Sequence, residues 1–149
     1  SGFALSKDKG HADNFSYIEH AVPHCTSDEL FKYILLGDSR GVFTGRILVA
    51  QDAQKTQAYQ NNRNLLLSPT ARMQSKPQLE IYADDVKCSH GMTTGQLSPE
   101  ALFYMQQRGI PREEAKLMLS HAFAEDVLER IPLDEEAEAI REHIAEQLR

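Results

Sequence analysis

The sequence lacks most of the features that are typical of membrane proteins, of secreted proteins and of proteins that bind a metal through clustered cysteines. It has no tryptophan and only two cysteines, and no apolar run approaches the roughly 20 residues of a membrane-spanning helix. Two cysteines cannot form a disulfide framework, so we expect a reducing, cytoplasmic setting. The start, Ser1-Gly2-Phe3, has neither the basic segment nor the apolar core of a signal peptide. No Cys-x-x-Cys motif is present.

Basic residues do not outnumber acidic ones either. The chain of 149 residues holds 16 Lys+Arg against 22 Asp+Glu, a net charge of −6. Residues 1–95 hold ten of each sign, whereas residues 96–149 hold six basic and twelve acidic residues, so the net charge lies in the last third. Phosphate binding needs a basic surface, so we do not expect a nucleic-acid partner. The acidic third predicts either a solvated helical surface or a docking surface for a basic partner.

Short apolar or β-branched runs separated by turn residues occupy the first 95 residues. The runs fall at residues 3–5, 15–18, 31–36, 42–50, 65–67 and 79–83. Strands of this length and spacing favour a sandwich, a barrel or a β-solenoid, and no strict repeat chooses among them. The Gln and Asn residues between positions 51 and 64 are expected on exposed strand faces and in turns, where amides bond to local backbone.

Start and stop signals divide the last third into three helices. Ser98 before Pro99 predicts the start of the first helix, and Gly109 predicts its end. Pro111 predicts the start of a second helix, and a third is predicted from about residue 134, where apolar residues recur every three or four positions. We place a β part at residues 1–96 and an α-helical part at residues 97–149.

Cys88 and His90 are the strongest candidates for residues with a chemical function. We expect the strand that contains residues 79–83 to lead to this pair, and Gly91 and Gly95 to bound a turn before the first helix. Residues two apart in a strand point to one face, with Cα atoms roughly 6.5 Å apart. Thiolate and imidazole suit iron, zinc and Fe–S clusters, but a closed site takes about four ligands. From the residues alone, a half-buried cysteine and a surface histidine are favoured over a site completed by another segment or chain.

A second group, His20, His24 and Cys25, is interpreted as structural. Adjacent residues His24 and Cys25 face opposite sides of a strand, and Pro23 interrupts any strand that would place His20 and His24 together. We expect these residues in turns and in the interior of the β part.

The chain resembles the SufB/SufD family of scaffold proteins for iron–sulfur cluster assembly, and its cysteine and histidine positions are most similar to those of SufD members. The similarity covers nearly the whole chain, as the C-terminal part of a longer protein. It is carried by residues 76–91, Gly95-Gln96-Leu97, Ala101-Leu102-Phe103-Tyr104, Asp13-Asn14 and residues 19–27. It implies a right-handed parallel β-helix (solenoid) of roughly four coils, each of about 20–25 residues, and then a C-terminal helical subdomain.

The resemblance also implies a function. It predicts a non-enzymatic scaffold subunit of the Suf complex that pairs with a SufB-like subunit through the β-helix. Residues 97–149 would dock a SufC-like ATPase, and this chain would bind no ATP. Cys88 and His90 would be candidate metal and Fe–S ligands at the SufB interface, where a transient cluster is shared. The alternatives are a carbohydrate-active β-solenoid enzyme, which needs paired carboxylates, and a plain protein-interaction module. Because the first coil of such a chain is uncovered, self-association into a homodimer is also expected.

Overall fold

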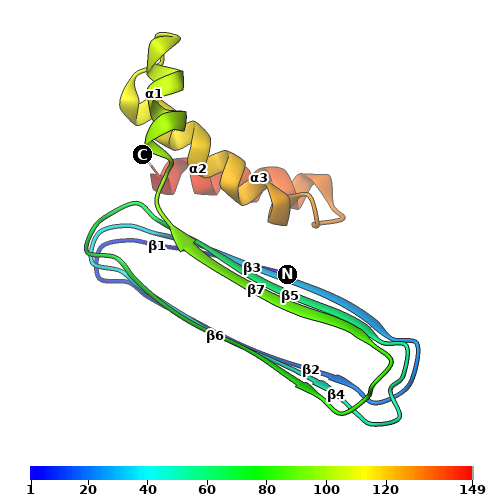
Figure 1. The fold of residues 1–149 in the computed structure, drawn as a ribbon. Helices are drawn as coiled ribbons and strands as arrows, with labels where there is room; N and C mark the ends of the chain where they lie inside the picture. Colours follow the sequence, from blue (N-terminus) through cyan, green and yellow to red (C-terminus); the bar gives the residue numbers. More distant parts are fainter. Residues whose placement is uncertain (149) are drawn as a thin grey trace.

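The protein is a parallel β-solenoid of about three turns followed by three helices. The computed structural model describes residues 1–148 (Figure 1). Its strands alternate between two sheets, with orders β1-β3-β5-β7 and β2-β4-β6, and every neighbouring pair is parallel. The strands are β1 (Gly2–Ser6), β2 (His11–His20), β3 (Thr26–Leu35), β4 (Arg40–Val49), β5 (Gln57–Leu66), β6 (Arg72–Ile81) and β7 (Lys87–Gly95).

The coils are longer and fewer than predicted. Register partners in neighbouring coils lie 29 to 32 residues apart, as for His11 with Arg40 and Arg40 with Arg72, so one turn of the solenoid takes about 30 residues. The expectation of four coils of about 20–25 residues is therefore wrong. Each turn contains two strands of about ten residues, which span roughly 33 Å at the usual rise per residue. The result is the flat, elongated cross-section seen in Figure 1.

The solenoid interior contains two apolar clusters. One is built around Ile47, Val49 and Ala58, and the other around Tyr33 and Phe43. Along β4, buried and half-buried residues alternate strictly, because successive side chains point into and out of the solenoid. These packed side chains fill the interior and stabilise the β part.

The amide-rich strand β5 departs from the prediction. Gln60, Asn62 and Asn64 point into the solenoid and are buried, so their expected place on exposed faces is wrong. Asn64 Nδ2 donates to Asn62 Oδ1 at 2.7 Å, and Ser75 Oγ donates to the same oxygen at 2.7 Å. Both of these bonds lie within one coil, because Asn64 is two residues along β5 and Ser75 is in β6. Across coils, Asn62 Nδ2 donates to the Phe31 carbonyl at 3.3 Å and Asn64 Nδ2 donates to the Thr93 carbonyl at 3.0 Å. These bonds offset part of the cost of burying the amides.

The helices begin and end close to the predicted positions. They are α1 (Pro99–Gln107), α2 (Arg112–Leu128) and α3 (Asp134–Leu148). Ser98 caps α1 by accepting a hydrogen bond from the Ala101 amide at 3.1 Å, and Gly109 follows the helix with φ of +84°. Both signals are confirmed. Within residues 1–148, no helix combines the length and the hydropathy needed to cross a membrane.

Helix α2 packs against the outer face of the sheet formed by β1 and β3. Phe3 and Leu5 of β1 contact the cluster of Ala124, Leu128 and Ile144. Beside this cluster, the buried Lys32 ammonium donates to the Phe123 carbonyl and to the Asp126 carboxylate, both at 2.6 Å. These contacts join the helices to the solenoid.

Candidate functional site at the open end of the solenoid

The last coil leaves one end of the solenoid uncovered within residues 1–148. Strand β7 pairs only with β5, and β6 pairs only with β4, so each has a free edge (Figure 1). The inward-facing side chains of this coil are partly open to solvent: Met92 is 49% exposed and Ile81 is 40% exposed. We call this surface, formed by the free edges and inward side chains of β6 and β7, the open end.

Cys88 and His90 both lie on β7 at the open end. Cys88 is in register with Ala58, and His90 is in register with Gln60. Both partners are buried in the interior, so Cys88 and His90 share the inward face of their strand. They differ in exposure, because Cys88 packs against the apolar cluster around Ala58, whereas His90 is exposed.

The Cys88 thiol is not an activated nucleophile in this structure. Burial raises its pKa, and the hydrogen bond with the Ala58 backbone only partly opposes that shift. A thiol of raised pKa holds its proton at neutral pH, and metal binding requires the thiolate. His90 lies on the same face, and its ring is exposed to solvent.

Two local expectations about this region are wrong. The run at residues 79–83 and Cys88 do not share a strand, because β6 ends at Ile81 and the chain then crosses to the other sheet. Gly91 does not form a turn either, since it lies within β7 opposite Asn61. A Cβ atom at Gly91 would sit 2.9 Å from Asn61 Oδ1. The glycine gives β7 room to stack closely on β5.

The described residues do not close a metal site on their own. Within residues 1–148, no group of three or more His, Cys, Asp or Glu side chains is arranged to hold a metal ion. Cys88 and His90 are therefore two candidate ligands at an open surface. A metal or cluster bound there needs further ligands from another source.

His20, His24 and Cys25 lie elsewhere, in the interior and in the corner between β2 and β3, which are the positions predicted for them. His20 faces the interior, its Nε2 lies 2.9 Å from Ser27 Oγ, and burial lowers its pKa. His24 occupies a corner of the solenoid with φ of +62°. Neither is near the open end, because β2 and its corners belong to the first coil.

Sequence reasoning missed the residues beneath His90. Gln60 lies directly under it in β5, and Glu29 lies under Gln60 in β3. Gln60 Nε2 donates to Glu29 Oε2 at 2.6 Å, and both side chains are buried. We call Glu29, Gln60 and His90 the polar row. Their spacings of 31 and 30 residues match the coil length, which is the signal that could have revealed them.

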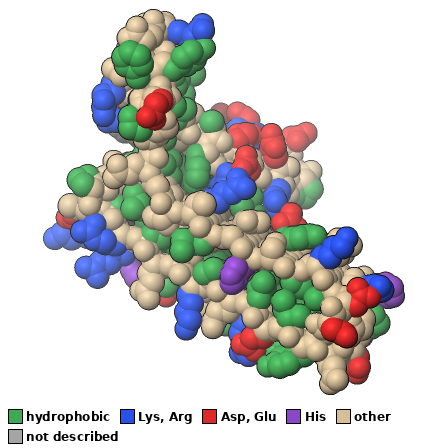
Figure 2. Space-filling view, viewed as in Figure 1, with side chains coloured by type: hydrophobic (Ala, Val, Ile, Leu, Met, Phe, Trp, Pro, Cys, Tyr) green, Lys and Arg blue, Asp and Glu red, His purple; other side chains and the backbone are tan. Residues whose placement is uncertain are grey.

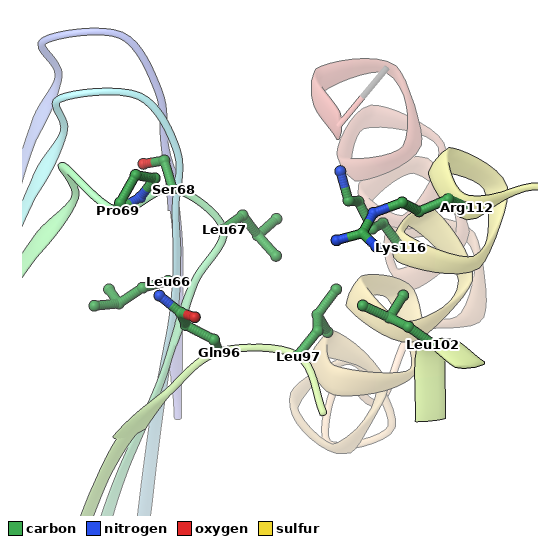
Figure 3. Close-up of a pocket in the computed structure, with 9 residues that line it drawn as sticks. All are labelled: Leu66, Leu67, Ser68, Pro69, Gln96, Leu97, Leu102, Arg112 and Lys116. Atoms are coloured by element: carbon green, nitrogen blue, oxygen red, sulfur yellow. The ribbon is translucent and has the colours of Figure 1, made fainter. Parts of the chain in front are cut away.

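The helical region presents a different surface. A pocket of about 260 Å³ lies between the corner after β5 and the helices. In Figure 3, Arg112 and Lys116 point from α2 toward Leu67 and Leu97. Phe103 and Tyr104 of α1 are exposed as well. Figure 2 shows acidic side chains gathered over α2 and α3, so this region combines exposed apolar groups with negative charge.

Comparison with known proteins identifies the family. The family model for the SUF system FeS cluster assembly, SufBD core domain, matches residues 1–123. The chain belongs to the SufBD family. It is 45% identical over 119 residues to the iron–sulfur cluster assembly protein SufD of Escherichia coli, covering 80% of this chain and 28% of that protein.

Two further relatives agree with this assignment. A SufBD family protein of Synechocystis is 45% identical over 122 residues, covering 82% of this chain and 27% of that protein. A SufBD family protein of Mycobacterium tuberculosis is 32% identical over 155 residues, covering 99% of this chain and 39% of that protein. The SufBD chain described here thus spans between about a quarter and two fifths of the relatives' length, and it is SufD-like.

Proposed function

We propose that this chain is the C-terminal part of a non-enzymatic, SufD-like scaffold subunit for iron–sulfur cluster assembly in the cytoplasm. Its solenoid, residues 1–96, pairs with a SufB-like subunit. Its helical part, residues 97–149, docks a SufC-like ATPase, and this chain binds no ATP. The cluster is transient cargo assembled at a site that the two scaffold subunits share. Membership of the SufBD family supports this proposal.

The observation that carries the proposal is the incomplete ligand set at the open end. His90 and Cys88 lie on one face of β7, and within residues 1–148 no third ligand joins them. A partner that covers this end would supply the missing ligands and shield the site from water. His90 is then the principal ligand from this chain, and Cys88 either holds sulfur as a thiolate or supports the packing beneath.

The free edges of the last coil support pairing with another solenoid. β6 and β7 each present unpaired backbone donors and acceptors, which favour the addition of a further strand. Ile81 and Met92 add apolar surface that burial would stabilise. Such an interface would place a partner's residues directly above His90.

The test is to replace His90 in the complete protein and to co-express it with SufB-like and SufC-like subunits. His90→Ala should abolish cluster assembly, measured as bound iron and sulfide and as visible absorbance. Because His90 is exposed, its loss should cost only about 0.5 kcal/mol and leave the melting temperature within a few degrees. Cys88→Ser should give a milder defect. Thr93→Ala, an exposed change on the same strand, is the matched control.

One result would overturn the ligand assignment. If His90→Ala assembles clusters at the wild-type level while Thr93→Ala behaves normally, His90 does not bind the cargo. Cys88 and His90 then keep only structural roles, and the proposed site at the open end is wrong.

A further inference from the structure

The polar row is unusual because it places a carboxylate deep in the solenoid. Glu29 is 5% exposed, and Gln60 is fully buried. The one side-chain hydrogen bond that joins them within residues 1–148 runs from Gln60 Nε2 to Glu29 Oε2. A buried carboxylate is costly unless it is well paired, and stability alone would favour an apolar pair here. Because burying the polar row costs free energy of folding, we expect it to have a function.

The direction of the Gln60 amide is fixed by Glu29. The amide turns its NH₂ group toward Glu29, because Nε2 donates to Oε2 of the Glu29 side chain. Its carbonyl oxygen, Oε1, is then held away from Glu29. That oxygen is buried and accepts no hydrogen bond within residues 1–148. A buried acceptor without a donor is rare, and it marks the place where a donor is expected.

The opposite sheet makes room for Gln60. Gly45 of β4 faces Gln60, and a Cβ atom there would lie 2.7 Å from Phe43 Cζ and closer still to Gln60 Nε2. One coil further on, the partner of Gly45 in β6 is Pro77, whose side chain has neither donor nor acceptor. Ser16 of β2, the other register partner of Gly45, has a buried hydroxyl without a partner in residues 1–148, but it lies one coil before Gly45, away from the open end. On the side of the open end, the neighbour that can donate to Gln60 is His90, its register partner in β7.

We propose that His90 donates one ring N–H to Gln60 Oε1 when the open end is covered, so that Glu29 and Gln60 act as positioning residues for the imidazole. Neighbouring strands lie about 4.8 Å apart, which is within reach of a ring nitrogen on an inward-facing side chain. Gln60 Oε1 can only accept, so it selects the tautomer whose N–H points inward. The other ring nitrogen then carries the lone pair and faces outward, where iron cargo would bind.

This inference rests on the proposed function for its purpose, but its test needs no cluster. The probe is the histidine tautomer in the 149-residue chain, read from ring ¹⁵N chemical shifts at a pH where imidazole is neutral. The His90 signals are assigned by their loss in His90→Gln, since the chain has six histidines. Binding of the SufB-like subunit provides the covered state.

Two variants and one control isolate the row. Gln60→Met keeps the length of the side chain and removes the acceptor, and Glu29→Gln removes the group that orients the amide. Gln57→Met, an exposed change on the same strand, is the control. In the covered state, we expect one His90 tautomer in the wild type and in Gln57→Met, and a mixture of both in Gln60→Met and Glu29→Gln.

The Glu29→Gln result is the most diagnostic. Glu29 lies two strands from His90, roughly 10 Å away, so a local packing change at Glu29 would not alter the ring tautomer. If Gln60→Met does not fold, Glu29→Gln still decides the question. A mixed tautomer in the covered wild type, or an unchanged tautomer in Glu29→Gln, would overturn the inference. Loss of assembly in His90→Ala with no effect of either variant on the tautomer would retain the proposed function and reject the polar row.

Discussion

Replacing Asp126 tests how the helices are held on the solenoid. The Lys32 side chain is 2% exposed, whereas that of Asp126 is 51% exposed. The Lys32 ammonium donates to Asp126 Oδ2 and to the Phe123 carbonyl, both at 2.6 Å, and lies 4.6 Å from the centre of the Phe123 ring. In Asp126→Ala, this buried cation keeps the carbonyl and the ring but loses its counter-ion.

The expected cost follows from the exposure of the two partners. Removing one partner of a fully buried pair costs about 3–5 kcal/mol, and losing a hydrogen bond to a charged group costs about 1.5–3 kcal/mol. Because Asp126 is half-exposed, water screens part of the interaction and the lower range applies. We expect a loss of about 2 kcal/mol in the free energy of unfolding. For a chain of this size, that corresponds to a melting temperature lower by about 4–8 °C.

A double-mutant cycle separates the ion pair from the packing. Lys32→Met keeps the apolar stem and removes the buried charge, so it should cost less than about 1 kcal/mol. In the Lys32→Met background, Asp126→Ala should then cost only about 0.5 kcal/mol. Asp28→Ala breaks an exposed pair with Arg130 and is the control, with an expected effect below about 0.5 kcal/mol. Thermal unfolding followed by circular dichroism compares the wild type with these four variants.

The reasoning fails if Asp126→Ala unfolds within about 0.5 kcal/mol of the wild type, because Lys32 would then have another way to reach water or a partner. The pH dependence gives a second check. The hydrogen bond from Lys32 is the main cause that lowers the Asp126 pKa. Its stabilising contribution is therefore complete above the unfolded-state value of about 3.9 and is lost as pH falls through the lower folded value. Lys32→Met should flatten the fall in stability over that acidic range.

Three further predictions concern the interior, the helices and the open end. Gly45→Ala should overpack the space beside Gln60 and lower the free energy of unfolding, measured with denaturant, by about 1–3 kcal/mol. Gly95→Ala is the control and should leave that free energy unchanged, because no atom lies within 4 Å of the added Cβ. Phe103→Asp should abolish capture of a SufC-like ATPase in a pull-down without lowering the melting temperature, because Phe103 is 62% exposed; undiminished capture would contradict the docking proposal. The isolated chain should self-associate through its free strand edges, and a clean monomer by light scattering at high concentration would show otherwise.

The helical region was predictable because its signals are local. Ser98 and Gly109 each act within one turn of the helix that they bound, so spacing along the sequence is enough to place them. The solenoid was harder. Thr26 meets Gln57 across 31 residues, and no local pattern records which residues become partners. Residue alternation therefore predicted strands but no coil length, and the length of about 20–25 residues that was taken from typical solenoid repeats was wrong.

The buried amides show how register overrides a local preference. Asn and Gln favour turns because they can bond to nearby backbone, and this rule placed residues 51–64 on the surface. In β5, the alternation of side chains sends Gln60, Asn62 and Asn64 inward. Each then donates to a residue of a neighbouring coil, 29 to 31 positions away: Glu29, the Phe31 carbonyl and the Thr93 carbonyl, respectively. Only the coil length reveals them.

The same register explains why two residues that looked equivalent in the sequence differ in the structure. Cys88 and His90 share one face of β7, but Cys88 stacks on Ala58 and an apolar cluster, whereas His90 stacks on Gln60, which is bonded to Glu29 beneath it. An apolar neighbour favours the neutral thiol, and a polar neighbour can orient an imidazole. Changes at Cys88 should therefore act partly through packing. Changes at His90 should act through ligand chemistry, because almost nothing in the fold depends on its exposed ring.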